Sequence, residues 1–311
     1  MTHIDGEHAE LVMSAGDMIF DTPVDENLVS FAGSCWTASN PLPWKRLIGV
    51  WSIHHRINIV LAVNDTPDGG EKYTIYRTLN GVDYIPVHTH DTEIYNIFYL
   101  DDGIALFSAD DDWWITTNTG LLWERMNLNE PCPAYTAVIV PMDEFDWYII
   151  AVGFDRVIRK LRYPNTGDGW EVLLDLSHIE SSFEPVVAGN AVCVIAGAGS
   201  RLWRTDFLGE DGWGLIHDFG ASSYVKRLVV SGYSSRPVFL AEVYKNGKSE
   251  IWWSKDAGDT WIMNETRYDT IESAQAVIPT ANDIEKAIFA VVGRRDSGTG
   301  YETKLIEISL R

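Results

Sequence analysis

The sequence predicts an all-β fold, and three observations support this prediction. Short apolar runs recur along the chain, each bounded by Asp, Gly, Pro or Asn, as is typical of buried strands. Helical periodicity with capping residues is absent through most of the chain. Six turn-like segments, 39 to 48 residues apart, end in an aromatic residue: Trp44, Tyr84, Trp123, Trp170, Trp213 and Trp261. A repeat of this length is typical of the blades of a β-propeller.

The clearest turn-like segment spans residues 254–261 and has the pattern Ser-x-Asp-x-Gly-x-Thr-Trp. Its glycine permits a backbone angle that a Cβ would oppose, and its aspartate can accept hydrogen bonds from nearby amides. The tryptophan is expected to pack between neighbouring sheets. The residues with these structural roles are Ser254, Asp256, Gly258, Thr260 and Trp261 in this copy, Asn118, Gly120 and Trp123 in a second, and Asn165, Gly167 and Trp170 in a third.

This pattern resembles the Asp-box, or BNR repeat, of sialidase-like β-propellers, and the resemblance spans nearly the whole chain. Only residues 254–261 match the pattern in full. Residues 80–84 and 206–213 are weaker copies, and residues 39–44 lack the glycine. The resemblance implies a divergent member of this superfamily, in which the boxes lie on the outer rim of the blades and support the fold rather than catalysis.

The apolar runs between the boxes predict the inner strands of each blade. First strands are expected at residues 95–100, 137–140, 186–188, 225–231 and 274–278, although residues 271–281 could instead form a helical turn. Second strands are expected at residues 57–63, 148–152, 191–196, 238–243 and 287–292. One blade can be predicted in full, with strands at residues 224–232, 237–244, 249–254 and 260–263.

The last blade is one strand short, because only three strands are predicted after Trp261. Closed propellers commonly complete the last blade with a strand from the other terminus, which removes exposed sheet edges. Residues 10–14 are the candidate for that strand. The chain, residues 1–311, is therefore predicted to be a single propeller domain of seven four-stranded antiparallel blades. Six blades are the alternative, if residues 14–48 form no complete sheet.

The composition limits the classes of partner. The formal net charge is −21, which disfavours contact with a nucleic-acid backbone and suits solubility or a basic partner. The start of the chain lacks the basic and apolar segments of a signal peptide, and no apolar run is long enough to span a membrane. Synthesis in the cytoplasm is expected. The three cysteines match neither a disulfide framework nor a metal-binding pattern.

An enzyme must be considered, because Asp-box propellers include sialidases and other glycoside hydrolases. The Arg-Ile-Pro segment of sialidases is absent here, and no arginine triad for a substrate carboxylate can be recognised from spacing. Glycoside hydrolysis needs two carboxylates at a defined separation, and the 45 acidic residues specify no particular pair. We therefore predict no catalytic residue.

Two other groups of residues are candidates for binding. His88 and His90, two apart on an expected strand, could share a metal ion with help from Asp91 or Glu93, although a plain connecting loop is the other interpretation. Two pairs of tryptophans precede boxes, and in each pair one ring should pack between blades while the other could contact a sugar or a protein. These possible binding aromatics are Trp113, Trp114, Trp252 and Trp253. No metal or cofactor site is predicted.

The function predicted from these patterns is a non-catalytic propeller that acts as a structural or interaction module in a larger assembly. The favoured version is a virion component such as a phage tail protein, and an assembly factor like the propellers that help build photosystem II would look similar. The alternative is a carbohydrate-binding or glycoside-hydrolysing propeller. Protein partners are expected, with a glycan or a second copy of the chain as further options.

Overall fold

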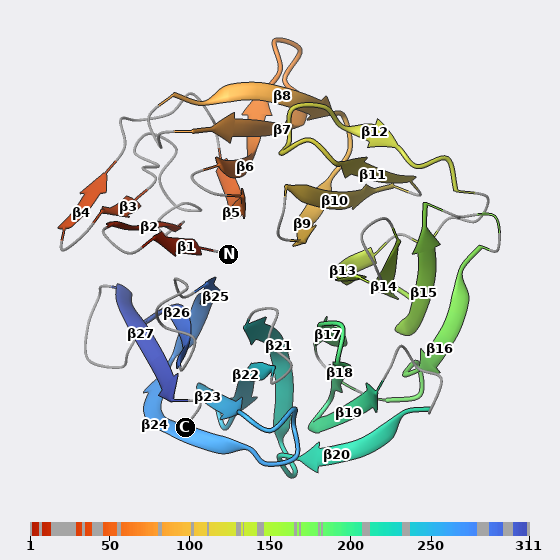
Figure 1. Ribbon diagram of the computed structural model, residues 1–311, viewed down its shortest axis with the longest axis vertical. Helices are drawn as coiled ribbons and strands as arrows, with labels where there is room; N and C mark the ends of the chain where they lie inside the picture. Colours follow the sequence, from red (N-terminus) through yellow and green to blue (C-terminus); the bar gives the residue numbers. More distant parts are fainter. Residues whose placement is uncertain are drawn as a thin grey trace. The chain divides into compact units, whose positions relative to one another are not determined.

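The structure is a computed structural model, and the parts of the chain that it describes contain strands and no helix (Figure 1). The described residues are 2–5, 8–13, 29–32, 35–38, 46–54, 57–79, 83–100, 103–110, 112–128, 132, 134–141, 146–164, 167, 169–179, 181, 183–206, 212–231, 237–278, 286–294 and 301–309. Within them, no helix could cross a membrane. The all-β prediction is confirmed.

Five sheets have four strands each, and in each of them consecutive strands pair antiparallel. The first two are β5 (Arg46–His54), β6 (Ile57–Asp65), β7 (Glu71–Thr78) and β8 (Ile85–His90), then β9 (Ile94–Leu100), β10 (Ile104–Ala109), β11 (Asp112–Thr116) and β12 (Glu124–Arg125). The other three are β13 (Ala134–Pro141), β14 (Trp147–Gly153), β15 (Val157–Tyr163) and β16 (Glu171–Asp175), then β17 (Val186–Gly189), β18 (Cys193–Ala198), β19 (Arg201–Asp206) and β20 (Gly214–Asp218), then β21 (Ser223–Ser231), β22 (Val238–Lys245), β23 (Lys248–Ser254) and β24 (Ile262–Tyr268).

The remaining strands form a sheet in the order β27-β26-β25-β1-β2-β3-β4. Their bounds are β1 (Thr2–Asp5), β2 (His8–Met13), β3 (Val29–Ala32), β4 (Cys35–Ala38), β25 (Thr270–Ile278), β26 (Lys286–Arg294) and β27 (Tyr301–Ser309). Residues 10–14 were predicted to pair with the last blade, and this is wrong for the residues described. Most of that run lies in β2, which pairs with β1 and β3, whereas β1 pairs in parallel with β25 through Thr2↔Val277 and His3↔Ile278.

The predicted strands are otherwise confirmed. Four of the five apolar runs assigned as second strands lie within β6, β14, β22 and β26, and the run at residues 191–196 overlaps β18, which begins at Cys193. The five first strands lie within β9, β13, β17, β21 and β25. The blade predicted in full corresponds to β21 through β24. The alternative of a helical turn at residues 271–281 is wrong for its described part, because β25 continues to Ile278.

Two compact units can be distinguished within the chain. The first unit contains Met1–Asn127 with Val277–Ile284, and the second contains Leu128–Ala276 with Glu285–Arg311. Each is described by itself below. One domain over residues 1–311, a count of seven blades and closure by the chain ends all stay predictions.

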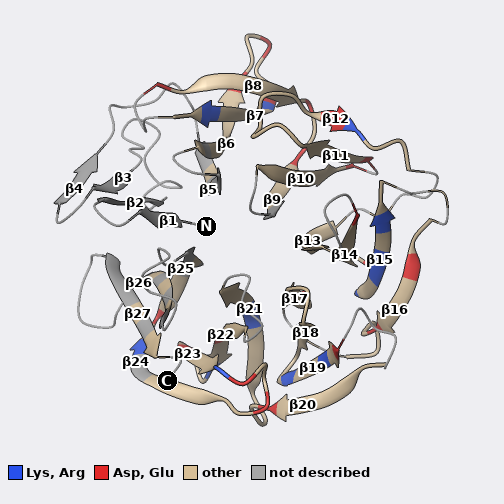
Figure 2. Cartoon of the chain, in the orientation of Figure 1, with Lys and Arg blue, Asp and Glu red and all other residues tan. Residues whose placement is uncertain are grey.

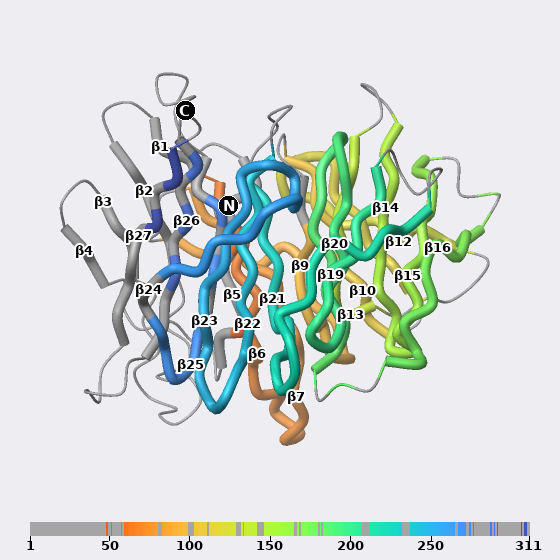
Figure 3. Tube along the Cα trace, turned by 90° about the horizontal axis from the view of Figure 1, so that it is seen from below, coloured from red at the N-terminus to blue at the C-terminus, as the bar shows by residue number. Residues whose placement is uncertain are grey.

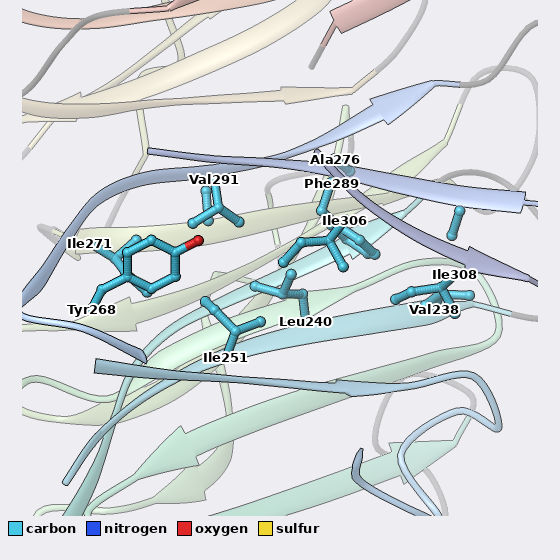
Figure 4. Packing of buried hydrophobic residues seen from close by; sticks show 12 residues of the cluster. Val238, Leu240, Ile251, Tyr268, Ile271, Ala276, Phe289, Val291, Ile306 and Ile308 are labelled. Carbon is cyan, nitrogen blue, oxygen red and sulfur yellow. The ribbon is translucent and has the colours of Figure 1, made fainter. Parts of the chain in front are cut away.

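Strand β22 shows how the sheets of the second unit pack. Its residues 238–243 are all fully buried, and alternate side chains point to opposite faces of the sheet. Val238 and Leu240 pack with β26 and β27, in a cluster that contains Phe289 and Ile306 (Figure 4). Phe239, Ala241 and Val243 pack on the other face, with residues from β17, β18 and β19. Burial on both faces favours apolar residues, which explains the run at residues 238–243, in which Glu242 is the exception.

Candidate functional site

The turn at residues 254–261 is closed by side-chain hydrogen bonds. Ser254 Oγ accepts from the Gly258 amide at 2.8 Å and donates to Asp256 Oδ1 at 2.7 Å. Asp256 Oδ1 also accepts from the Thr260 amide at 2.9 Å. Burial alone would raise the pKa of Asp256, but the hydrogen bonds from Thr260 and Ser254 outweigh it and hold the pKa below its ordinary value. The carboxylate therefore stays charged as the acceptor at the centre of the turn.

This turn is packed against the sheet before it. Gly258 has φ +96°, and a Cβ on it would lie 2.7 Å from Ile195 Cδ1 and 2.8 Å from Ile216 Cδ1. Trp261 is 8% exposed, lies in the same cluster, and donates its Nε1 hydrogen to the Gly258 carbonyl at 2.9 Å. Every residue of the pattern makes hydrogen bonds or packing contacts within the fold. Little of the turn except its exposed tip is therefore accessible to a ligand.

The segment at residues 116–123 repeats the same hydrogen bonds. Thr116 Oγ1 donates to Asn118 Oδ1 at 2.9 Å and accepts from the Gly120 amide at 3.1 Å, and Asn118 Oδ1 accepts from the Leu122 amide at 3.0 Å. Gly120 has φ +78°, and Trp123 is 5% exposed. Threonine and asparagine thus take the places that Ser254 and Asp256 have in the first copy. In the third copy Asn165 lies outside the described residues, while Gly167 and the half-buried Trp170 are described.

His88 and His90 belong to an aromatic cluster. The His88 ring lies 4.8 Å from the Trp114 ring, 5.4 Å from Phe107 and 6.0 Å from His90, between centroids. His90 Nδ1 accepts a hydrogen bond from the Thr92 amide at 3.3 Å. Asp91 pairs with Lys72 at 3.2 Å. No group of three potential metal ligands occurs among the described residues.

The protonation of His88 should make the protein less stable in mild acid. Burial, and secondarily the nearby His90, lower the pKa of His88 from 6.5 to about 4. The unfolded chain therefore binds this proton more readily, and the stability present above pH 6.5 is lost as the pH falls toward 4. We expect a loss of roughly 2 kcal/mol, less than a fully buried group would give. Urea unfolding at pH 7 and 4.5 measures it. His88→Gln should reduce the pH dependence, and the same change at the exposed His178 should not.

The four tryptophans predicted as possible binding aromatics are all packed against neighbours. Trp113 is 1% exposed, and Trp114 is half-buried with Phe107 and His88. Trp252 is half-buried beside Phe219, at 5.2 Å between centroids, and donates to Glu250 Oε2 at 3.2 Å. Trp253 packs in the cluster with Leu240 and Ile251. The rings expected to project outward are thus covered to a large extent by the fold.

A surface that sequence reasoning missed lies at one end of the sheets of the second unit. We call it the aromatic end surface and define it by Tyr135, Phe154, Phe183, Tyr224 and Tyr244. Each lies at or next to the beginning of a first strand or the end of a second strand. Because consecutive strands are antiparallel, these positions are at the same end of each sheet. The available signal was this repeated placement of aromatic residues, which is independent of the Asp-box spacing.

Ring contacts and one hydrogen bond join the members of this surface. Phe183 lies 5.8 Å from Tyr224 and 5.7 Å from Tyr244, both edge to face. Phe154 lies 5.5 Å from Tyr135, whose hydroxyl donates to the Pro185 carbonyl at 2.6 Å. Phe154 is 47% exposed, and the other four rings are half-buried. The group is thus held in place and still offers aromatic area to solvent.

Arg156 fixes the connection that carries Phe183. Its guanidinium donates to the carbonyls of Ile179 at 2.7 Å, Phe183 at 2.8 Å and Ser181 at 3.2 Å, and pairs with Glu184 at 3.2 Å. Its backbone has φ +64°, a conformation that non-glycine residues seldom adopt. The side-chain contacts of Arg156 offset the cost of this backbone conformation.

Replacing Arg156 with alanine should destabilise the second unit. Four charge-assisted hydrogen bonds are lost and the unfavourable backbone angle remains, so we expect about 2 kcal/mol by urea unfolding. Arg201→Ala is the matched control. It lies beside the corresponding turn of the next sheet, and its side chain, which is 53% exposed, pairs with Asp218 at 3.2 Å. An exposed pair of this kind should contribute less than about 1 kcal/mol. Equal effects of the two substitutions would contradict the role given to Arg156.

Two cations border the aromatic end surface on β21. Lys226 Nζ lies 5.9 Å from the centre of the Phe183 ring and 3.5 Å from Glu242 Oε1, and Arg227 Nη1 lies 3.4 Å from Glu242 Oε2. Both side chains are about a third exposed (31% and 29%), whereas Glu242 is fully buried on β22. Figure 2 shows these cations in blue on β21, as well as those of β15.

A shallow polar cavity of about 460 Å³ lies in the first unit, beside the turn between β6 and β7. Figure 3 shows this turn, in orange, as a projecting loop. Asn64, Lys72 and Thr74 line the cavity from the strands, and Thr66 and Asp68 line it from the turn. Asn64 Nδ2 donates to Thr74 Oγ1 at 3.0 Å and to Tyr76 Oη at 2.8 Å. The cavity therefore combines hydroxyl, amide, carboxylate and ammonium groups.

Comparison with solved structures shows the fold class. YCF48 bound to D1 peptide is 12% identical, with a TM-score of 0.56 over 95% of this chain and 88% of that chain. BBS1N in complex with ARL6DN is 11% identical, with a TM-score of 0.61 over 98% and 88%. The SapL1 lectin in complex with α-methyl fucoside is 11% identical, with a TM-score of 0.51 over 84% and 94%.

These three structures are β-propellers, which confirms the predicted fold class. At such low identities the likeness shows the fold alone. No protein-family model and no curated protein matches the chain. Membership of the Asp-box superfamily therefore stays a prediction that depends on the residues at 254–261 and 116–123.

Proposed function

We propose that this β-propeller is an interaction module that binds a protein partner through its aromatic end surface. The observation that carries the proposal is the linked group of five rings, with Phe154 47% exposed at its edge. Aromatic residues and arginine are enriched at protein interfaces, and tyrosine offers a large contact area at small entropic cost. Arg156 holds the connection in shape before a partner arrives, which lowers the ordering cost of binding.

Two of the similar structures support this proposal by what they contain. YCF48 is bound to a peptide and BBS1N to a protein, so the same fold presents partner-binding surfaces in other proteins. A virion, a cellular assembly factor or a homo-oligomer would each provide a setting for such a module. Detection of the chain in purified virus particles would identify a virion as the setting.

Photocrosslinking in the native host tests the proposed surface. A photoreactive phenylalanine analogue at position 154 should crosslink a defined protein. The same analogue at Leu215, which is 57% exposed on the outermost strand β20, is the matched control and should not. Phe154→Ser should then reduce recovery of that protein about tenfold, which corresponds to about 1.4 kcal/mol. Crosslinking from Leu215 alone, from both positions equally or from neither would contradict the proposal.

A carbohydrate-binding function is the second candidate, and the polar cavity beside the β6–β7 turn favours it. Its hydroxyl, amide and carboxylate groups are those that bind the hydroxyls of a sugar, and the SapL1 lectin carries a sugar on the same fold. Binding to a glycan array tests it. Asn64→Ala should abolish binding of any sugar found, whereas Asn190→Ala in the second unit should not. A sugar that binds equally to the Asn64 variant would exclude this cavity.

A further inference from the structure

Two salt bridges at the aromatic end surface present their acidic sides to solvent. Arg159 donates to both carboxylate oxygens of Asp155, at 2.9 Å to Oδ1. Arg156 pairs with Glu184 at 3.2 Å and donates to three main-chain carbonyls. The carboxylate side chains are 51% and 53% exposed, whereas the guanidinium side chains are only 21% and 18% exposed. The cations are thus turned inward, and the exposed charge of both pairs is negative.

A third carboxylate lies close to these pairs. Asp175 on β16 is exposed, and its partner in the strand register is Val157, two residues after Asp155. The hydrogen bond from the Ser177 side chain lowers the pKa of Asp175, so this group is charged at neutral pH. Exposed carboxylates therefore border this edge of the aromatic end surface from more than one strand connection.

Tyr135 connects the carboxylates to the exposed ring of the surface. Its ring lies 5.5 Å from that of Phe154, and its hydroxyl donates to the carbonyl of Pro185, which follows Glu184. Burial, and then the charges of Glu184 and Asp155, raise the pKa of Tyr135. Phe154 directly precedes Asp155 and is 47% exposed. An accessible aromatic face and two accessible carboxylates are thus neighbours.

We propose that an arginine side chain of a basic partner segment lies over the Phe154 ring and pairs with Glu184 and Asp155. This inference rests on the proposed function and adds the chemistry of the partner. A guanidinium group suits this place because its plane stacks on an aromatic face while its donors bind carboxylates. Glu184 accepts a hydrogen bond from Arg156 on Oε2, and a carboxylate has about four acceptor sites, so a second guanidinium can also bind.

The charges favour a basic segment over an acidic one. The formal net charge of −21 attracts a basic segment from a distance, and the exposed carboxylates stabilise it at contact. An acidic segment would meet the same carboxylates and be repelled, because the guanidinium groups beside them are turned inward. The protein itself contains a similar ring contact, since Lys226 Nζ lies 5.9 Å from the centre of the Phe183 ring.

Peptide binding measured by fluorescence anisotropy tests the proposal. The probe is a short fluorescein-labelled peptide of alternating Arg and Gly, and two control peptides have citrulline or Lys in place of Arg. The Arg peptide should bind most tightly. Citrulline keeps the shape of arginine without its charge, and Lys keeps the charge without the planar group.

Substitutions in the protein locate the binding. Glu184→Gln should raise the Kd of the Arg peptide about fivefold, while Arg156 keeps its three carbonyl acceptors. Glu171→Gln is the matched control, because Glu171 pairs with Lys160 at 3.2 Å in the same unit and its side chain is 64% exposed. It removes the same charge and should leave the Kd unchanged. Phe154→Leu should raise the Kd about threefold, and Phe154→Tyr, which retains a ring, should not.

Five results would each overturn the inference. Equal binding of the Arg and citrulline peptides would show that no cation is recognised, and equal binding of the Arg and Lys peptides would exclude stacking of a guanidinium. Equal Kd values in Glu184→Gln and Glu171→Gln would remove Glu184 from the contact, and an unchanged Kd in Phe154→Leu would remove the ring. A labelled single-stranded oligonucleotide that binds more tightly than the Arg peptide would identify a phosphate-bearing partner instead.

The crosslinking experiment separates this inference from the proposed function. If crosslinking from position 154 succeeds while any of the five results occurs, the interaction function stands and only the partner chemistry fails. If crosslinking fails as well, the aromatic end surface is not an interface.

Discussion

Trp261→Ala is expected to destabilise the second unit by about 4 kcal/mol, one of the two largest effects of a single substitution anticipated for this protein. The indole is 8% exposed and packs with Phe219, His217 and Trp252 in the cluster between two sheets. Its removal leaves a large cavity and also breaks the hydrogen bond to the Gly258 carbonyl. Chemical unfolding followed by circular dichroism would give the change in the free energy of unfolding.

Two controls separate the contributions of the Trp261 side chain. Trp261→Phe keeps most of the ring and loses the Nε1 hydrogen bond, so a cost of about 1–2 kcal/mol is expected. Leu215→Ala removes an apolar side chain that is 57% exposed and should change stability by less than about 0.5 kcal/mol. If Trp261→Ala unfolds no more easily than Leu215→Ala, the packing role assigned to the Asp-box tryptophan is wrong.

Phe107→Ala should cost a similar amount, about 4 kcal/mol, in the first unit. Phe107 is fully buried on β10, and its ring lies 5.2 Å from Trp123 and 6.1 Å from Trp114. It also contacts His88, so its removal should admit water beside the imidazole. We therefore expect the pKa of His88 to rise from about 4 toward 6.5, which an NMR titration of the ring protons measures.

Phe107→Leu is the conservative control and should cost less than about 1.5 kcal/mol. Because it refills most of the space, the pKa of His88 should stay low in this variant. A low pKa of His88 in Phe107→Ala as well would show that burial by this ring is not what lowers it.

The repeat of tryptophans and apolar runs predicted most of the strands, because both patterns reflect local requirements. Burial on two faces favours apolar residues, as in β22 with the exception of Glu242, and a turn with a positive φ angle favours glycine, as at Gly258. These requirements can be recognised within a few residues of sequence. The pairing of β1 with β25 depends on residues far apart in the chain, and no local pattern indicates that residues 2–5 rather than residues 10–14 pair with β25.

The candidate binding residues were harder to predict for the same reason. Strand alternation predicted that one ring of each tryptophan pair faces away from the packing between blades, without specifying which ring, and Trp114 and Trp253 both pack against buried clusters. Tyr135 and Phe183 carry no motif. Their placement depends on long-range hydrogen bonds, from the Tyr135 hydroxyl to the Pro185 carbonyl and from Arg156 to the Phe183 carbonyl. Glu242 lies in an otherwise apolar run, and this single carboxylate was the available sign that charged groups lie nearby.

The hydrogen bonds of Arg156 have a consequence for how this protein can change during evolution. Three of its four acceptors are main-chain carbonyl oxygens, which every amino acid possesses. The path of the connection before β17 is therefore nearly independent of the side chains that it carries. A substitution at Phe183 can therefore change the exposed aromatic surface without removing the hydrogen bonds that Arg156 donates to this connection. The shape of this connection can thus be conserved through Arg156 while its exposed side chains vary. Related chains with different partners should retain the arginine.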